Sequence, residues 1–497
     1  MKRYILSIDQ STSATKAVLF DGSGDIIGRV SVPHKQYYPA AGFVEHDGEE
    51  IYANTLNVMK RCAKEYALSE MNLAAVAITN QRETAIVWNK KTGKPIANAA
   101  VWQCLRGEPL CIKLKTEGHA EAVEKITGLV LDPYFSASKI TWLLDNVQGA
   151  RENAAAGDLA FGTIDSWLVW KLTGGKAHVA DYTNACRTLL LDIHSLEWSE
   201  ELFNLFDIPI EMAPELVYSD TVVGKTRKGE PFDYEVPIAG LSGDSHAALF
   251  GETCFDPGTA KATYGTGSSI MMNIGATPRK SKKGIVTSVG YCLGSGAAYA
   301  FEGNIHSTGA TIQWLVEDIG LIKSPAECTS ISKSVPSTDG VYLVPAFVGL
   351  GAPYWDSEAR ALITGMSRST QKAHIARAAV ESIAYQVRDL VEVMAAEAGL
   401  KISVLNADGG PSRDEFLMQF QADILGLSVQ SAAIEEVSAL GSAYAAGLAI
   451  GLWSGIDELR SLSKNGTWYK DKMNATERER LVAGWKSAVD RTRWRPT

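Results

Sequence analysis

Short apolar runs and longer amphipathic stretches follow one another along the whole chain. Tyr4–Ile8, Ala17–Phe20 and Ile26–Val30 are short apolar runs separated by turns of small polar residues, a pattern that predicts a β-hairpin followed by a third strand. Glu49–Tyr66 has the length of a helix, and Leu73–Thr79 has the continuous apolar pattern of a buried strand. Strands that alternate with helices in this way predict a layered α/β fold.

The second half of the chain opens with a similar pattern. Lys261–Tyr264 and Ile270–Ile274 are apolar runs on either side of a small-residue turn, residues 265–269, and a helix-length stretch, Gly309–Ile319, follows. Each half therefore begins with a strand, a small polar turn and another strand. We expect two related units that meet near residue 250 and face a common cleft.

A corner between a strand and a helix is predicted late in the chain. His374–Ala398 carries apolar residues at helical spacing, Ile402–Leu405 has a strand pattern, and Ser412 or Asp414 can cap a helix that ends near Leu425. Glycines between the strand and this last helix let a phosphate or a ring approach the backbone. Ligands of open α/β sheets bind at such corners.

Composition and charge limit the classes of function. The chain has 497 residues and a formal net charge of −9, which counts against a general nucleic-acid binder because phosphate backbones require clustered Lys and Arg. No run reaches the ~18 apolar residues of a membrane span, and the apolar start is too short for a signal peptide. Seven dispersed cysteines without a CxxC pair predict reduced thiols and a cytoplasmic location.

The turn Asp9–Lys16 is the first candidate site. Its small hydroxyl residues, between two strands, could direct backbone N–H groups at a phosphate. Asp9 at a strand end could bind Mg²⁺ directly or through water, and Lys16 adds a positive charge. An ordinary polar hairpin is the alternative interpretation, with about even odds for a turn of this kind.

Asp244 is the second candidate. It follows the strand-like run Pro237–Leu241 within Gly243-Asp244-Ser245-His246. A carboxylate at this place could orient an alcohol and accept its proton during phosphoryl transfer. The alternative is a structural Asp that caps the helix starting near Ser245.

The third candidate combines a charge pair with aromatic residues. Arg82 and Glu83 follow the strand Leu73–Thr79 and, if buried, offer donors and acceptors for the vicinal hydroxyls of a polyol. Trp102 and Tyr134 could line the same pocket, because an aromatic face packs against C–H groups. The alternatives are a solvated ion pair and ordinary core packing. The dispersed histidines and cysteines do not suggest a metal centre of their own.

Several ordered motifs together resemble the FGGY family of carbohydrate kinases, and its glycerol-kinase branch most of all. The motifs are Ile8–Thr12, Ile78–Thr84, Val101–Cys104, Leu131–Ser136 and Asp181–Ala185, together with Tyr134–Asn146 and Ala361–Glu381, which fit the two signature patterns of the family. The resemblance extends from about residue 4 to about residue 490.

The resemblance implies an actin-like two-domain ATPase fold with ribonuclease-H-like cores and with ATP and Mg²⁺ in the cleft between them. Residues 1–250 would form the domain that holds the acceptor and the first phosphate turn, and residues 251–497 the nucleotide domain. Asp244 would be the catalytic base, and Asp9 and Asp244 would be linked to the metal. The implied acceptor ligands are Arg82, Glu83, Trp102, Tyr134 and Asp244; the implied nucleotide ligands are Thr12, Ser13, Lys16, Thr266, Gly309, Gln313, Gly410 and Asp414.

Two departures from the branch concern the acceptor pocket. Glycerol kinases typically have Gln where this chain has Ser245, and Phe where it has Ser269. Both changes replace a large side chain by a small one, so we expect an enlarged pocket and an acceptor of four or five carbons. In contrast, the acceptor residues that suit glycerol are all present, namely Arg82, Glu83, Trp102 and Tyr134.

The sequence therefore predicts an ATP-dependent kinase that phosphorylates a primary hydroxyl of a small polyol or sugar. One alternative is a ketopentose kinase such as a xylulokinase, and another is a sugar-acid kinase in which His246 supplies an extra cation. A non-catalytic, actin-like nucleotide-binding protein would not need Arg82, Glu83 and Asp244 together. We expect a homo-oligomer, as is common in the family.

Overall fold

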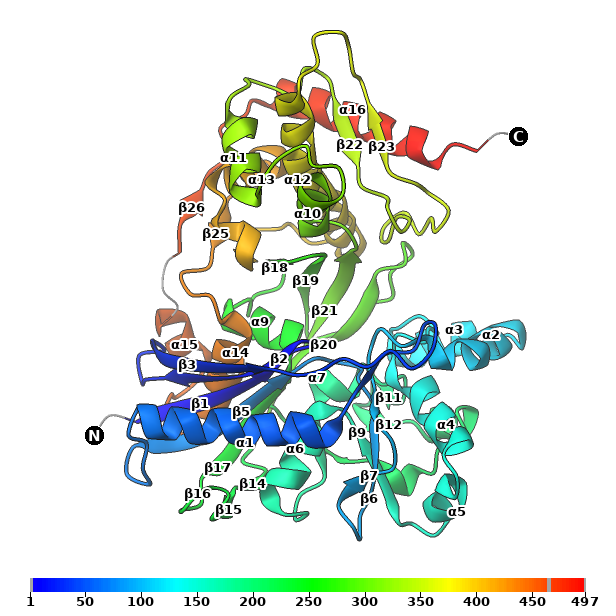
Figure 1. Cartoon of the computed structure of the whole chain (residues 1–497), viewed down its shortest axis with the longest axis vertical. Helices are drawn as coiled ribbons and strands as arrows, with labels where there is room; N and C mark the ends of the chain where they lie inside the picture. Colours follow the sequence, from blue (N-terminus) through cyan, green and yellow to red (C-terminus); the bar gives the residue numbers. More distant parts are fainter. Residues whose placement is uncertain (1–2, 463–465, 496–497) are drawn as a thin grey trace.

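The computed structural model describes residues 3–462 and 466–495, and these form two lobes (Figure 1). The first lobe is built on a six-stranded sheet with the strand order β14-β17-β5-β1-β2-β3. These strands are β1 (Tyr4–Gln10), β2 (Ala14–Phe20), β3 (Ile26–Pro33), β5 (Leu73–Asn80), β14 (Gly224–Lys225) and β17 (Pro237–Gly243). β1 pairs antiparallel with β2 and parallel with β5, and β5 pairs parallel with β17.

Helices from opposite ends of the chain cover the two faces of this sheet. On one face, α1 (Gly48–Glu65) packs against side chains such as Leu6 and Ile8 of β1. On the other face, α14 (Val437–Ala449) packs against Ile5 and its neighbours. β1 is therefore apolar on both faces, which explains its continuous apolar run.

Smaller elements between residues 45 and 232 complete the first lobe. The strands are β4 (Glu45–His46), β6 (Ile86–Asn89), β7 (Lys94–Pro95), β8 (Ala99–Ala100), β9 (Leu159–Gly162), β10 (Val179–Asp181), β11 (Leu191–Asp192), β12 (Glu197–Trp198), β13 (Glu215–Val217), β15 (Arg227–Lys228) and β16 (Pro231–Phe232). The helices are α2 (Glu108–Thr116), α3 (Ala120–Thr127), α4 (Ser136–Asn146), α5 (Ala150–Ala155), α6 (Ile164–Thr173), α7 (Tyr182–Ala185) and α8 (Glu200–Leu205).

The second lobe is built on a seven-stranded sheet among the described residues, with the order β20-β21-β19-β18-β24-β25-β26. Its strands are β18 (Ala260–Tyr264), β19 (Ser268–Gly275), β20 (Val286–Leu293), β21 (Gly296–Ile305), β24 (Leu405–Asp408), β25 (Val429–Ser431) and β26 (Trp468–Tyr469), and β22 (Tyr342–Val344) pairs separately with β23 (Leu362–Thr364). The helices are α10 (Gly309–Glu317), α11 (Pro325–Lys333), α12 (Lys372–Ala398), α13 (Glu415–Leu425) and α16 (Ala475–Arg493).

The two sheets share one topology. In the first, an antiparallel set (β1, β2, β3) is followed by the parallel strands β5 and β17. In the second, an antiparallel set (β18, β19, β21) is followed by the parallel strands β24 and β25. This correspondence supports the expectation that the two halves are related units.

The chain returns to the first lobe after building most of the second. α9 (Asp244–Gly251) crosses α14 at backbone contact, because a Cβ atom on Gly441 would lie 1.8 Å from the carbonyl oxygen of Ala247. α15 (Ile456–Leu462) lies beside α14 on the first lobe, whereas α16 lies on the second (Figure 1). A division into domains 1–250 and 251–497 stays a prediction. Helices α14 and α15 belong by residue number to the second of these domains, but they pack on the first lobe.

Most predicted elements agree with the structure, and one strand is displaced. The predicted strand Ile402–Leu405 is wrong at its start, because β24 runs from Leu405 to Asp408. Register explains the shift: Leu405, Asn406 and Ala407 pair with β18 on one side and β25 on the other. A buried polar residue, Asp408, ends the strand, so the apolar run alone placed it too early.

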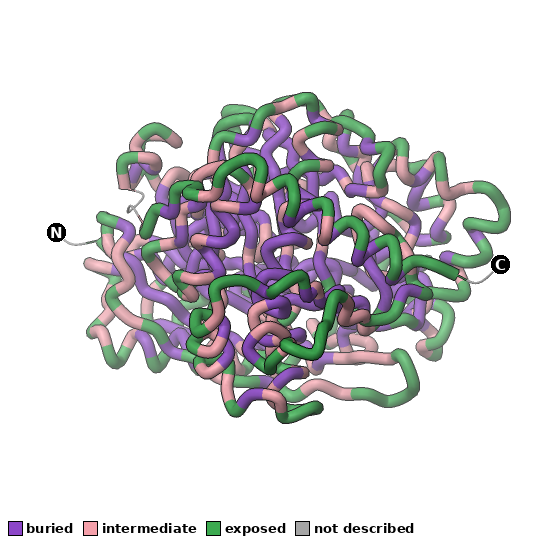
Figure 2. The backbone as a smooth tube through the Cα atoms, turned by 90° about the horizontal axis from the view of Figure 1, so that it is seen from above, coloured by how far each residue is buried: buried purple, intermediate pink, exposed green. Residues whose placement is uncertain are grey.

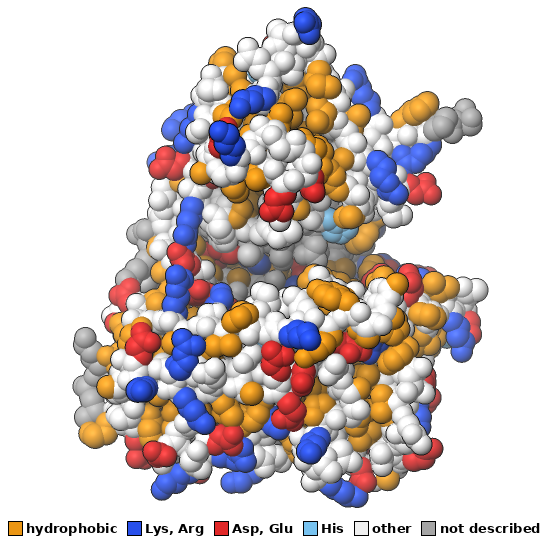
Figure 3. All heavy atoms as spheres, viewed as in Figure 1, with side chains coloured by type: hydrophobic (Ala, Val, Ile, Leu, Met, Phe, Trp, Pro, Cys, Tyr) orange, Lys and Arg blue, Asp and Glu red, His pale blue; other side chains and the backbone are white. Residues whose placement is uncertain are grey.

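Burial follows the two sheets, with buried residues concentrated in the interior of both lobes (Figure 2). A deep notch separates the lobes on one side of the space-filling view (Figure 3). No helix in the described part of the chain is long and apolar enough to cross a membrane. All seven cysteines are buried free thiols.

The contact between α9 and α14 yields a stability prediction. Replacing Gly441 with Ala places a methyl group against the backbone of Ala247, so we expect the free energy of unfolding to fall by about 1–3 kcal/mol, the usual effect of overpacking. Urea unfolding followed by tryptophan fluorescence measures the loss. Gly455→Ala is the matched control, because nothing lies within 4 Å of the added carbon. Equal stability of the two variants would contradict the close crossing.

Candidate active site

Three neighbouring parallel strands end at one edge of the first sheet. Gly243 of β17 is the register partner of Asn80 of β5, and Asn80 is the partner of Gln10 of β1. The carboxyl ends of β1, β5 and β17 therefore bring Asp9, Arg82 and Asp244 to the same edge. The sequence predicted each of these residues from its place near the end of an apolar run and from the family resemblance, and neither shows that the three residues lie together.

The backbone after β5 is strained at Glu83. Glu83 has a φ of +61°, a left-handed conformation that costs a non-glycine residue about 1–3 kcal/mol. The turn is held by Thr84, whose N–H donates to the carbonyl oxygen of Arg82 at 2.7 Å, and by Ser136, whose hydroxyl donates to the carbonyl oxygen of Glu83 at 3.0 Å. This turn directs both the Arg82 and the Glu83 side chains inward.

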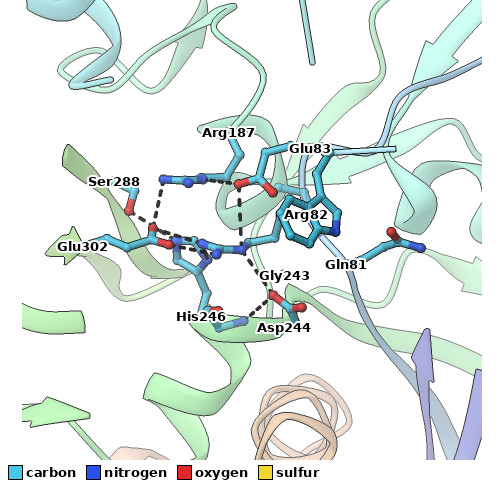
Figure 4. Close-up of polar contacts among 12 residues, drawn as sticks. Gln81, Arg82, Glu83, Arg187, Gly243, Asp244, His246, Ser288 and Glu302 are labelled. Atoms are coloured by element: carbon cyan, nitrogen blue, oxygen red, sulfur yellow. Dashed lines mark hydrogen bonds and ion pairs between the residues drawn. The ribbon is translucent and has the colours of Figure 1, made fainter. Parts of the chain in front are cut away.

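Arg82 and Glu83 belong to a buried ring of alternating charges (Figure 4). Arg82 Nη2 lies 2.8 Å from Glu302 Oε1, and Arg187 Nη1 lies 2.9 Å from Glu302 Oε2. Arg187 Nε donates to Glu83 Oε1 at 2.6 Å, and Arg82 Nε lies 3.9 Å from the same oxygen. All four side chains are at most 5% exposed, which excludes the solvated-pair interpretation of Arg82 and Glu83.

Asp244 is the first residue of α9 and faces the cleft edge of the charge ring. Gly243, not Asp244, occupies the N-cap position, so the capping interpretation is not supported in its simple form. The Asp244 carboxylate accepts from its neighbour Ser245 N–H at 2.6 Å and keeps 36% of its side chain exposed. Arg82 Nε lies 3.2 Å from Asp244 Oδ1, yet it makes no hydrogen bond with any described residue. Arg82 therefore retains one buried N–H donor next to an accessible carboxylate.

Burial and neighbouring charges shift the pKa values of the buried groups in different directions. For Glu302, burial acts to raise the pKa, but Arg187 and Arg82 more than offset it, so its pKa lies below the ordinary value. For Glu83, burial raises the pKa more than Arg82 and Arg187 lower it. Burial, followed by the charge of Arg82, lowers the pKa of His246 well below its usual range. This lowered pKa does not support the extra cation predicted at His246.

Trp102 and Tyr134 lie together as the predicted aromatic pair. Their ring centroids are 5.5 Å apart in an edge-on arrangement. Trp102 Nε1 donates to the hydroxyl of Thr12 at 3.0 Å, and Trp102 N donates to the hydroxyl of Thr84 at 3.2 Å. Lys139 of α4 donates to the carbonyl oxygen of Tyr134 at 2.5 Å. The aromatic pair is thus fixed to the phosphate turn on one side and to the Arg82–Thr84 turn on the other.

The two small residues that depart from the family pattern lie beside this cluster. Ser245 follows Asp244 on α9 and is half-buried. On β19, Met271 lies opposite Glu302 of β21. Ser269 is two residues before Met271 on the same strand and lies opposite Asn304. Directly opposed residues share a sheet face and alternate residues return to it, so Ser269 is on the face that carries Glu302. Its hydroxyl is buried without a hydrogen-bond partner among the described residues.

The turn after β1 places two charges at the first-lobe edge. Asp9 is 7% exposed, and burial raises its pKa to about 6, with Glu436 and Asp244 adding to the shift and Lys16 opposing it. Lys16 Nζ lies 3.5 Å from Asp9 Oδ2 and donates to Glu436 Oε2 at 2.8 Å. Ser13 is exposed within the same turn. The Lys16 ammonium group therefore lies between two carboxylates, those of Asp9 and Glu436.

The chemistry of these groups fits Mg²⁺. Asp9 and Asp244 supply hard carboxylate oxygens. Burial is the main cause of the raised pKa of Asp9, and the smaller repulsion by Asp244 would be relieved by a divalent cation. Among the described residues, no three His, Cys, Asp or Glu side chains are grouped so that they could hold a metal ion by themselves. One or two carboxylates completed by phosphate oxygens and water are the usual surroundings of Mg²⁺.

A cavity of about 740 Å³ in the second lobe brings together five of the predicted nucleotide residues. They are Thr266, Gly309, Gln313, Gly410 and Asp414. The turn after β18 meets the start of α10, where the Gly309 N–H donates to the carbonyl oxygen of Gly265 at 2.9 Å. Asp414 caps α13 through Phe416 N–H and accepts from the hydroxyl of Thr329. This volume is in the range of pockets that hold small molecules and cofactors.

The sequence did not predict three residues that are distant along the chain but contact the site. Arg187, Glu302 and Glu436 were not predicted, although each contacts a predicted residue. Glu302 was detectable in principle as a single acidic residue within the apolar strand run Ala298–Gly303, and Arg187 as a single cation within an apolar stretch. A charge inside an apolar run predicts a buried partner but does not identify it.

Comparison with known proteins covers nearly the whole chain. The N-terminal domain model of the FGGY family of carbohydrate kinases matches residues 4–251, and the C-terminal domain model matches residues 260–450. Glycerol kinase 1 of Thermotoga maritima is 52% identical over 486 residues, which cover 98% of this chain and 99% of the relative. Glycerol kinase 2 of the same organism is 48% identical over 490 residues, 99% of both chains.

A solved structure gives the same result in three dimensions. The crystal structure of Plasmodium falciparum glycerol kinase with ADP superposes with a TM-score of 0.95 at 36% identity and covers 99% of both chains. The predicted two-domain α/β fold is thereby confirmed. Since both domain models match and the relatives align from end to end, the chain belongs to the FGGY family of carbohydrate kinases.

Proposed function

We propose that this protein transfers the γ-phosphoryl group of ATP to a primary hydroxyl of a small polyol. Membership of the family makes the chain a phosphotransferase with an alcohol group as acceptor. The names of the relatives support glycerol-like acceptors over ketopentoses. The lowered pKa of His246 does not support the cation that the sugar-acid alternative requires.

One observation carries the proposal. Arg82 has a buried Nε–H without a hydrogen-bond partner among the described residues, and this nitrogen lies 3.2 Å from the Asp244 carboxylate. A hydroxyl oxygen that accepts from Arg82 Nε is held within reach of an oxygen that accepts its proton. Vicinal donors and acceptors of this kind match the alternating oxygens of a polyol.

The residues then act in sequence on the acceptor. Arg82 and Glu83 orient the hydroxyl groups, and Trp102 and Tyr134 pack against the C–H groups of the carbon chain. Asp244 accepts the proton of the primary hydroxyl as the hydroxyl oxygen attacks the γ-phosphorus of ATP. The bond from the γ-phosphorus to the β,γ-bridging oxygen breaks, and ADP leaves. Phosphoryl transfer requires mainly this positioning together with stabilisation of charge.

The nucleotide side is supplied by both lobes. Thr12, Ser13 and Lys16 would contact phosphates from the first lobe, and Thr266 from the second, while the 740 Å³ cavity receives the rest of the nucleotide. Asp9 and Asp244 would hold Mg²⁺, which supplies neutralisation of the phosphate charge. The Trp102–Thr12 hydrogen bond connects acceptor and phosphate sites directly.

The size of the acceptor is the finer part of the proposal. Ser245 and Ser269 leave space where larger side chains are typical of glycerol kinases, and the unpaired Ser269 hydroxyl offers a polar partner inside that space. An unsatisfied buried hydroxyl is unfavourable unless a ligand meets it. We therefore propose that polyols of four or five carbons are better acceptors than glycerol.

Location and assembly complete the proposal. Seven buried free thiols support a reducing compartment, which for this protein is the cytoplasm. A homo-oligomer stays a prediction that light scattering on the purified protein would test.

Asp244→Asn tests the assignment of the base. Removing the proton acceptor while keeping the shape should lower kcat by about 10²–10⁴-fold, whereas the dissociation constant for ATP measured without Mg²⁺ should stay nearly unchanged. A coupled ADP-release assay gives kcat, and equilibrium titration gives nucleotide binding. Asp457→Asn, whose side chain is 97% exposed, is the control and should behave as the wild type. Near-normal turnover in Asp244→Asn would show that another group takes the proton.

The acceptor pocket is tested by restoring the larger side chains. In the wild type, kcat/KM for tetritols and pentitols should exceed that for glycerol. In Ser245→Gln combined with Ser269→Phe, the ratio of kcat/KM values should shift toward glycerol by about 10-fold or more, the usual range for steric discrimination. Glycerol as the best wild-type acceptor by a clear margin would overturn the enlarged pocket while leaving the phosphotransferase assignment intact.

A further inference from the structure

Glu302 reaches the acceptor site from the opposite lobe. It lies on β21 of the second sheet, and its side chain is fully buried. Arg82 Nη1 donates to Glu302 Oε2 at 3.0 Å, and Arg82 Nη2 forms an ion pair with Oε1 at 2.8 Å. Both terminal nitrogens of Arg82 are therefore engaged by one carboxylate, and Nε is the nitrogen left for a ligand.

We propose that Glu302 is a positioning residue for phosphoryl transfer: it holds the Arg82 guanidinium so that Nε faces the acceptor and Asp244. The proposal rests on the function proposed above, because it assigns Arg82 to the acceptor. Glu302 itself contacts neither substrate nor reacting atoms. It acts through Arg82.

The arrangement of charges explains why a carboxylate is required at this place. Arg82, Glu302, Arg187 and Glu83 alternate in sign around the ring (Figure 4), so their formal charges cancel. Asp244 is then the one carboxylate of the cluster without a counter-ion dedicated to it. Without the charge of Glu302, the ring becomes positive, and Arg82 is drawn into a closer ion pair with Asp244. This ion pair then engages both the Asp244 carboxylate, which is the proposed base, and the Arg82 Nε–H, which is the proposed donor to the acceptor.

A neighbouring imidazole supports the same orientation. His246 Nδ1 lies 3.4 Å from Arg82 Nη1, and His246 Nε2 lies 3.4 Å from the hydroxyl of Ser288. A guanidinium only donates hydrogen bonds, so Nδ1 is the acceptor and Nε2 carries the proton. His246 thus adds a second acceptor for the same terminal nitrogen of Arg82.

The strand that carries Glu302 is anchored to the first lobe. The hydroxyl of Tyr299, three residues before Glu302 on β21, donates to the carbonyl oxygen of Ile193 at 2.6 Å. On neighbouring β20, Thr287 N–H donates to the carbonyl oxygen of Gly128 at 2.9 Å. These contacts fix the part of the second sheet from which Glu302 extends, so the carboxylate stays at the acceptor site.

Kinetics of Glu302→Gln, which keeps the shape and removes the charge, test the proposal. The acceptor KM should rise about 10-fold to 100-fold and kcat should fall, whereas the KM for ATP should change less than 2-fold. Calorimetric titration with the best wild-type polyol should show the same loss of acceptor affinity in the absence of nucleotide. An acceptor KM within 2-fold of the wild type in a folded variant would overturn the positioning role.

Glu381→Gln is the matched control for a merely structural effect. Glu381 is also a buried carboxylate of the second lobe, and it is paired with Arg377 at 2.7 Å, away from the acceptor site. This variant should lose stability but retain the acceptor KM. Equal rises in acceptor KM in Glu381→Gln and Glu302→Gln would mean that loss of any buried carboxylate disturbs the site, and would overturn the proposal.

A double variant covers the case in which Glu302→Gln does not fold. Glu302→Gln combined with Arg187→Gln removes one charge of each sign, so the remaining Arg82 and Glu83 are again balanced. If Glu302→Gln folds, the double variant should bind the polyol more tightly than Glu302→Gln does. If Glu302→Gln does not fold, the double variant should bind the polyol more weakly than the wild type does. Wild-type affinity in the double variant would overturn the proposal.

The assay of the wild type separates the proposed function from the role of Glu302. No turnover with any polyol contradicts the proposed function, whereas turnover with unchanged acceptor KM in the variants contradicts only the role of Glu302.

Discussion

Burial of two arginines together with two glutamates is the constraint on which the site depends. A single charge moved out of water costs several kcal/mol unless an opposite charge and hydrogen bonds replace the solvent. Here each of Arg82, Glu302, Arg187 and Glu83 has an opposite charge on either side. Since the members come from the end of β5, from the segment after α7 and from β21, the ring closes only when the two lobes meet in one arrangement.

Around this ring, two sheets of the same topology supply complementary halves of a reaction site. The first sheet ends with three parallel strands, and their carboxyl ends present Arg82, Asp244 and Asp9, which are proposed as an acceptor ligand, the base and a metal ligand. The second sheet presents the turn after β18 and the cavity against α10 and α13. Trp102 connects the two proposed subsites, because its indole N–H donates to the hydroxyl of Thr12 in the turn after β1. The order of the strands in each sheet therefore decides which residues each lobe contributes to the proposed site.

Local features of the chain were predictable, and distant pairings were not. Asp9, Arg82 and Asp244 could be singled out because each follows an apolar strand directly, a relation that is contained in adjacent residues. Arg82 and Glu302 are separated by 220 positions, and no periodicity relates them. The place of α14 was equally hidden: its residues are apolar on all sides, so its sequence predicts burial without indicating which sheet it covers. The displaced start of β24 shows the same limit, because pairing on both sides of the strand decided its bounds.

The central claim is transfer of a phosphoryl group to a terminal alcohol at the cleft between the lobes. The most direct measurement is ³¹P NMR of the wild-type protein with ATP, Mg²⁺ and a polyol such as a tetritol. The account predicts one new phosphomonoester signal on a primary carbon, appearing in step with ADP and absent with Asp244→Asn. Formation of ADP and inorganic phosphate alone, across polyols of three to five carbons, would contradict it.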